Sequence, residues 1–242
     1  MKAVFLADAH LKHADDDGYR SLMHFFDHMT AVDDLFIAGD FFDFWFCRNG
    51  LVYPEFKEAI DKLVGLQKRG VRVALCEGNH DFHLESFFSK RLGMTVFTEW
   101  APVVLDGRKI LISHGDTVDE TNKRYLRLRK ILRSRLFCRI QRIMPLALLW
   151  KIARLSSMTS KELSTESENC MAEKMEAFSR KKFIEGFDAV ILGHCHKPMI
   201  KEYVIDGRKR TFATLGDWVK HHSWLYYEDG RFTLNYHRAN PS

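Results

Sequence analysis

The chain has 242 residues, of which 46% are hydrophobic and 29% charged. This composition is typical of a globular protein and excludes collagen-like, low-complexity and largely disordered chains. The formal net charge is only +5, and the length suits one large domain or one domain with a sizeable insertion.

The first part of the chain alternates predicted strands and helices. Short, continuously apolar runs predict buried strands at residues 3–7, 34–40 and 71–76. Between them, apolar residues recur at helical spacing and predict helices at residues 20–29 and 54–68. This βαβ rhythm indicates an α/β protein.

The remaining predicted elements are a short helix and a series of strands. Three Asp-Gly pairs at 106–107, 206–207 and 229–230 indicate hairpin turns, and the last two belong to a C-terminal meander. The other predictions are a helix at 87–92 and strands at 103–105, 109–113 and 187–192.

Residues 117–182 interrupt this pattern, since they read as helices and contain almost no glycine. We expect them to form a helical insertion, or lid, on a core made of residues 1–116 and 183–242. Within the insertion, residues 121–161 hold twelve Lys and Arg and no Asp or Glu. Such a block predicts an acidic partner, which is nucleic acid, an anionic membrane surface or a phosphorylated substrate.

Polar side chains follow five of the predicted strands, and the carboxyl ends of strands converge in an α/β sheet. They offer carboxylate, amide and imidazole donors that suit Mn²⁺, Fe or Zn²⁺, and they are too many for one tetrahedral centre. A pair of such metals activates water for attack on phosphorus, so the pattern predicts phosphoester chemistry. These side chains are Asp8 and His10, Asp40 and Asp43, Asn79, His80 and Asp81, His114 and Asp116, and His194 and His196.

The same side chains lie in five ordered motifs. The motifs are Asp8-Ala9-His10, Gly39-Asp40-Phe41-Phe42-Asp43, Gly78-Asn79-His80-Asp81, His114-Gly115-Asp116 and Gly193-His194-Cys195-His196. Together they resemble the motifs of the calcineurin-like metallophosphoesterases, over residues 3 to about 216 without the insertion. The resemblance implies an α/β fold in which two packed mixed β-sheets are flanked by helices.

The resemblance also implies a site with two divalent metal ions, for which Mn²⁺ is the usual metal. One metal would be held by Asp8, His10, Asp40 and His196, and the other by Asp40, Asn79, His114 and His194. His80 would act near the scissile group as a general acid or an electrostatic stabiliser, and Asp81 would orient it. The alternative for His80 is a supporting contact to the ligands.

Within the superfamily, the chain resembles the UDP-2,3-diacylglucosamine diphosphatases of lipid A biosynthesis in residues 39–45, 114–125, 160–161 and 215–218. This resemblance implies hydrolysis of UDP-2,3-diacylglucosamine to UMP and 2,3-diacylglucosamine 1-phosphate (lipid X). The candidate substrate contacts are Asn79, His80, Asn122, Tyr125, Ser160 and Lys161.

Two of these positions depart from the best-known branch of that family, which has Arg in place of His80 and Asp in place of Asn122. The departures indicate either a divergent branch with the same substrate or a sibling hydrolase. For Asn122, Tyr125, Ser160 and Lys161, a plain role on a helix surface is the alternative.

An acylated substrate needs an apolar chamber, which residues 146–155 could line, and its membrane attracts cations. We therefore expect a cytoplasmic protein that makes peripheral contact with the anionic inner membrane, because no apolar run spans a bilayer. The docking cations would be most of Arg127, Arg133, Arg135, Arg139 and Arg142.

Two rival functions follow from the same residues. A nuclease of the superfamily would also use a basic surface, but the neighbours of the arginines are aliphatic rather than the exposed aromatics that stack on bases. A scaffold without enzymatic activity would have lost metal ligands, and every ligand position is filled here. We therefore expect neither a nucleic-acid partner nor an obligate protein partner.

Overall fold

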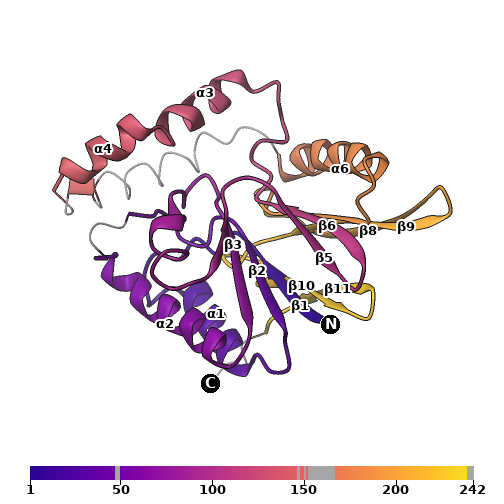
Figure 1. The fold of residues 1–242 in the computed structure, drawn as a ribbon, viewed down its shortest axis with the longest axis horizontal. Coiled ribbons are helices and arrows are strands. Elements are labelled where there is room, and N and C mark those ends of the chain that lie inside the picture. Colours follow the sequence, from indigo (N-terminus) through magenta and orange to yellow (C-terminus); the bar gives the residue numbers. More distant parts are fainter. Residues whose placement is uncertain (47–49, 146–147, 150, 152–166, 239–242) are drawn as a thin grey trace.

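The structure is a computed structural model that describes residues 1–46, 50–145, 148–149, 151 and 167–238. It contains two mixed β-sheets packed face to face, with helices on their outer faces (Figure 1). This confirms the α/β fold with two packed sheets that the motifs implied.

The larger sheet has six strands in the order β11-β10-β1-β2-β3-β4, and the smaller has five in the order β5-β6-β7-β9-β8. The strands are β1 (Lys2–Leu6), β2 (Asp34–Ala38), β3 (Arg72–Cys76), β4 (Thr95–Phe97), β5 (Ala101–Leu105), β6 (Arg108–Ser113), β7 (Ala189–Leu192), β8 (Pro198–Ile205), β9 (Arg208–Leu215), β10 (Ser223–Glu228) and β11 (Arg231–Tyr236). The helices are α1 (Asp17–His28), η1 (Pro54–Phe56), α2 (Lys57–Lys68), η2 (Leu84–Ser86), α3 (Lys123–Leu132), α4 (Arg135–Ile143) and α6 (Glu168–Ile184).

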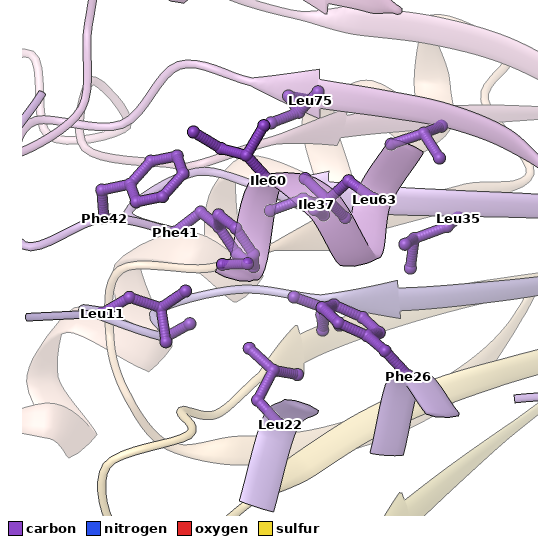
Figure 2. Close-up of a cluster of buried hydrophobic side chains, with 14 of the residues drawn as sticks. Leu11, Leu22, Phe26, Leu35, Ile37, Phe41, Phe42, Ile60, Leu63 and Leu75 are labelled. Atoms are coloured by element: carbon purple, nitrogen blue, oxygen red, sulfur yellow. The ribbon is translucent and has the colours of Figure 1, made fainter. Parts of the chain in front are cut away.

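Strand β1 is apolar from Ala3 to Leu6 because both of its faces are buried there. Val4 and Leu6 belong to the core beneath α1 and α2, whereas Ala3 and Phe5 belong to the core between the two sheets. Figure 2 shows the first of these cores, in which side chains of both helices gather around the strands. Those labelled on the helices are Leu22, Phe26, Ile60 and Leu63.

Strand β7 in the smaller sheet divides its side chains in the same way. Ala189 and Ile191 face the larger sheet, while Val190 and Leu192 pack with α6. Helix α6 is therefore an outer layer of the core, and the predicted boundary at residue 182 falls inside it. Helices α3 and α4, which also lie in the predicted insertion, stand away from both sheets (Figure 1).

The predicted hairpins are confirmed, because β5–β6, β8–β9 and β10–β11 are antiparallel pairs. The helix predicted at 87–92 is wrong. Here η2 is followed by turns whose amides bond to carbonyls three, four and five residues back, and Gly93 ends the run with a φ of +69°. Six residues are too few to stabilise a helix that lacks a regular hydrogen-bond ladder. The short edge strand β4 was not predicted.

Among the described residues, no helix combines the length and the apolar character that crossing a membrane requires.

Candidate metal centre

The seven predicted metal ligands emerge where strands end. Strands β1 and β2 run parallel with Leu6 beside Ile37, so Asp8 and Asp40 leave the sheet at the same edge. Strands β6 and β7 are also parallel, and His114 Nε2 lies 3.1 Å from His194 Nδ1. The structure thus brings together the whole predicted set, which is Asp8, His10, Asp40, Asn79, His114, His194 and His196.

Five of these seven residues adopt left-handed backbone conformations, with φ values between 45° and 66°. This conformation costs a non-glycine residue roughly 1 to 2 kcal/mol, and such strain gathers at functional sites where the surrounding fold enforces it. Four of the five, which are His10, Asp40, His194 and His196, line one cleft of about 580 Å³. The five residues are Asp8, His10, Asp40, His194 and His196.

Asp8 lies between two histidines at distances that are too long for hydrogen bonds. Its Oδ1 is 3.8 Å from His10 Nε2 and 3.7 Å from His196 Nε2. Two ligand atoms that each lie about 2.1 Å from one cation are separated by roughly 3 to 3.5 Å, close to what is seen here. Among the described residues, Asp8 Oδ1 is buried without a hydrogen-bond partner, so the donor set fits a divalent cation.

Asp40 occupies the position between the two predicted ligand groups. Its Oδ2 lies 3.3 Å from His114 Nε2 and 3.8 Å from His10 Nε2. His114 in turn lies 2.8 Å from Asn79 Oδ1. This position suits a carboxylate shared by two cations, which is the bridging role that remains our prediction for Asp40.

The buried carboxylates make the cleft favourable for positive charge. Burial lowers the pKa of His114, but Asp40 and Asp8 outweigh it and raise this pKa to about 10. Burial is likewise outweighed at His196, where Asp8 and Asp217 raise the pKa to about 9. At His194, burial and the charge of His114 lower the pKa to about 4. Divalent cations would supply the same positive charge that protons supply here.

His80 is held differently from the prediction. Its Nδ1 lies 3.0 Å from the carbonyl oxygen of Asp43, and its backbone amide donates to Asp40 Oδ1 at 2.8 Å. The carboxylate of Asp81 is fully buried and accepts four backbone N–H bonds, from Gly78 and residues 40–42. The prediction that Asp81 orients His80 is therefore corrected. Asp81 joins the loop after β2 to the loop after β3, because it binds residues 40–42 and Gly78. The Asp43 carbonyl orients the His80 ring.

The predicted substrate contacts on α3 have structural partners. The Tyr125 hydroxyl donates to Asp116 Oδ2 at 2.5 Å, and the Asn122 side chain caps the helix by accepting from the Tyr125 amide at 3.2 Å. Their contacts with substrate remain predictions. The two further candidates, Ser160 and Lys161, lie outside the described residues.

The sequence analysis gave no role to Asp217, which contacts the predicted ligand His196 on the ring nitrogen that faces away from Asp8. Its Oδ1 accepts the backbone amides of residues 219–221, and its Oδ2 lies 3.4 Å from His196 Nδ1. Such a contact selects the ring tautomer that leaves Nε2 free to bind a metal. A signal was available, because Gly216-Asp217 follows strand β9 as Gly39-Asp40 follows β2.

Comparison with known proteins gives a consistent result along the whole chain. Residues 1–198 match the family described as calcineurin-like phosphoesterase. The UDP-2,3-diacylglucosamine hydrolase of Aeromonas salmonicida is 30% identical over 247 residues, which cover 100% of this chain and 95% of the relative. The UDP-2,3-diacylglucosamine hydrolase of Pseudomonas aeruginosa is 30% identical over 244 residues, which cover 100% of this chain and 99% of the relative.

Proposed function

This chain belongs to the calcineurin-like phosphoesterase family, and we propose that it hydrolyses the diphosphate of UDP-2,3-diacylglucosamine to UMP and 2,3-diacylglucosamine 1-phosphate. The observation that carries the proposal is the convergence of the seven donor residues, of which His10, Asp40, Asn79, His194 and His196 line one cleft and Asp8 and His114 lie buried against them. The choice of substrate is supported by 30% identity over the full chain to hydrolases named for it.

The donor set would hold two divalent cations, for which we propose Mn²⁺. Asp8, His10, Asp40 and His196 would hold one, and Asp40, Asn79, His114 and His194 the other. When bound, such a pair of cations polarises phosphoryl oxygens and lowers the pKa of the attacking water. The mixture of carboxylate, amide and imidazole donors suits a cation of intermediate hardness such as Mn²⁺.

The hydrogen bond of His80 limits its chemical role. A carbonyl oxygen only accepts, so Nδ1 must carry a proton in its contact with Asp43. The neutral ring then presents a lone pair at Nε2, and only the imidazolium presents an N–H there. We assign to His80 the stabilisation of charge on the phosphoryl group as water attacks the α-phosphorus, or the role of general acid in the same step. The bond from the α-phosphorus to the bridging oxygen breaks, this oxygen leaves with the lipid 1-phosphate, and the proton lost by water goes to solvent.

Helices α3 and α4 support the proposed contact with anionic lipid. Leu128, Ile131, Leu136 and Ile143 are 54%, 60%, 67% and 82% exposed on them. Exposed cations, which are Arg124, Arg127, Lys130 and Arg139, lie on the same two helices. Apolar side chains mixed with cations are typical of helices that lie in a membrane interface. Arg133 is not among these cations, because it turns inward.

The test is hydrolysis of UDP-2,3-diacylglucosamine beside bis-p-nitrophenyl phosphate, with Mn²⁺, Mg²⁺ or a chelator, scored by release of UMP. We expect UMP release that depends on Mn²⁺ and stops with the chelator. Turnover of the nitrophenyl ester without UMP release would refute the lipid substrate and favour another phosphodiesterase, such as a nuclease or a nucleotide diphosphate hydrolase.

A further inference from the structure

Helix α3 turns a polar face toward the metal centre. Tyr125, Arg129 and Arg133 are spaced by four residues and so lie on one face of the helix. All three are partly buried and bond to the loops that carry Asn79 and His114 or to groups beside those loops. Ile131 is 60% exposed, whereas Leu128 is 54% exposed and lines a small pocket together with Asn79, Tyr125 and the two arginines.

Arg133 binds the loop that carries Asn79 and His80. Its Nη2 donates to the carbonyl oxygen of Gly78 at 2.7 Å. Its Nη1 donates to Glu77 Oε2 at 2.8 Å and to the carbonyl oxygen of Thr98 at 3.1 Å. A guanidinium can bond to several acceptors at once because its donors have a fixed planar geometry.

At Gly78, only backbone atoms are available to hold the loop that carries Asn79 and His80 in place. A Cβ on Gly78 would lie 2.1 Å from Asp40 Oδ1 and 2.4 Å from the Asp40 amide nitrogen, so no side chain fits there. The position of the loop therefore depends on backbone contacts. Asp81 binds the Gly78 amide, and Arg133 binds its carbonyl oxygen.

Arg129 and Tyr125 form a second contact, at the loop that carries His114. Arg129 Nε and the Tyr125 hydroxyl both donate to Asp116 Oδ2, at 2.7 and 2.5 Å. Arg129 also donates to both carboxylate oxygens of Glu99, at 2.8 and 3.1 Å. Asp116 is only 7% exposed, so its charge depends on these donors.

We infer that α3 holds the loop that carries Asn79 and the loop that carries His114. Arg133 is a positioning residue, which fixes the position of Asn79 and His80 through its bond to the Gly78 carbonyl. The inference rests on the proposed metal centre. It assigns to α3 two roles on opposite faces, because the helix that exposes apolar and cationic side chains also holds the metal ligands in place.

The test compares Arg133→Gln with Arg208→Gln, the same loss of charge at an exposed arginine at the start of strand β9. Isothermal titration of the metal-free proteins with Mn²⁺ gives a readout that does not require turnover. We expect Arg133→Gln to weaken Mn²⁺ affinity by about 10- to 100-fold, the usual effect of losing a residue that orients metal ligands. The kcat for bis-p-nitrophenyl phosphate should fall with little change in KM, and Arg208→Gln should match the wild type in both.

Arg133→Gln leaves Glu77 buried without its cation, so the single variant can fail to fold. The double variant Glu77→Gln/Arg133→Gln removes both charges and keeps an oxygen for the Leu84 amide, which Glu77 now binds at 2.9 Å. We expect this folded variant to show the same loss of Mn²⁺ affinity, and Arg133→Lys to recover only part of it, because Lys cannot reproduce the planar contact.

Wild-type Mn²⁺ affinity and wild-type kcat in the folded double variant would overturn the inference. The outcome is separate from that of the proposed substrate. If the wild type releases no UMP from the lipid diphosphate, the substrate is refuted, whereas the Mn²⁺ titrations of the variants still decide whether α3 positions the ligands.

Discussion

Asp217→Asn should weaken metal binding by His196, although Asp217 is not itself a predicted ligand. The His196 ring faces Asp8 through Nε2 and Asp217 through Nδ1, at 3.7 and 3.4 Å. With a carboxylate at residue 217, the proton is favoured on Nδ1 and the lone pair on Nε2 faces the cleft. Burial opposes the charge of Asp217, but hydrogen bonds from His196 and from the backbone outweigh it and hold the pKa well below its usual range, so Asp217 is a carboxylate at neutral pH.

Asp217 Oδ2 lies 3.4 Å from His196 Nδ1 and also 3.0 Å from His221 Nδ1. The side-chain amide introduced by Asp217→Asn keeps an acceptor at only one of the two carboxylate positions. Its oxygen is expected to stay with the three backbone amides of residues 219–221, which lie 2.6 to 3.0 Å from Oδ1 of Asp217. Its NH₂ group then faces His196 Nδ1 and favours the tautomer whose proton is on Nε2. The ligand lone pair points away from Asp8, and Mn²⁺ affinity should fall by about 10- to 100-fold, or roughly 1.4 to 2.7 kcal/mol.

Isothermal titration with Mn²⁺ at pH 7.5 measures this loss, and urea unfolding of the metal-free protein serves as the control. The backbone bonds persist in the variant, so the free energy of unfolding should change by only about 1 to 2 kcal/mol. An Asp217→Asn protein that binds Mn²⁺ as tightly as the wild type would refute the tautomer argument.

Three further outcomes are expected. Asp40→Asn should abolish turnover and reduce Mn²⁺ binding together, and turnover at the wild-type rate would contradict two cations that share this carboxylate. Ile143→Asp should weaken binding to anionic vesicles by about 10-fold in a sedimentation assay, because it removes an exposed apolar side chain and adds a charge of the wrong sign; equal binding would argue against α4 as the lipid contact. Hydrogen bonds from Lys201 and Tyr203 lower the pKa of Glu176 to about 2, so its stabilisation is present above the unfolded pKa of about 4.3 and is lost as the pH falls through about 2. Glu176→Gln should therefore cost about 1 kcal/mol in urea unfolding at pH 7 and less at pH 3, and a cost that grows toward acid would contradict this sign.

The strands that are buried on both faces, the hairpins and the predicted ligands of the site can be read from the sequence alone, whereas the short edge strand β4 cannot. Strands buried on both faces are apolar along most of their length, as in residues 3–6 of β1 and 35–38 of β2, so they can be recognised without a structure. The donors stand directly after these strands, and parallel strands end at one edge, so their convergence followed from their order in the chain.

The polar groups that hold the ligands in place become visible only once the chain is folded. Arg133 and Gly78 are 55 residues apart in the sequence. Asp217 and His196 are separated by the β8–β9 hairpin. No sequence periodicity links either pair. In the sequence, Arg129 and Arg133 cannot be told apart from the neighbouring cations, but in the structure both turn inward to buried carboxylates. The structure also places α6 on the core rather than with α3 and α4. The physical reason is that apolar burial follows a local pattern along each element, whereas the partner of a long polar side chain depends on which distant segments the packed sheets bring within hydrogen-bond reach.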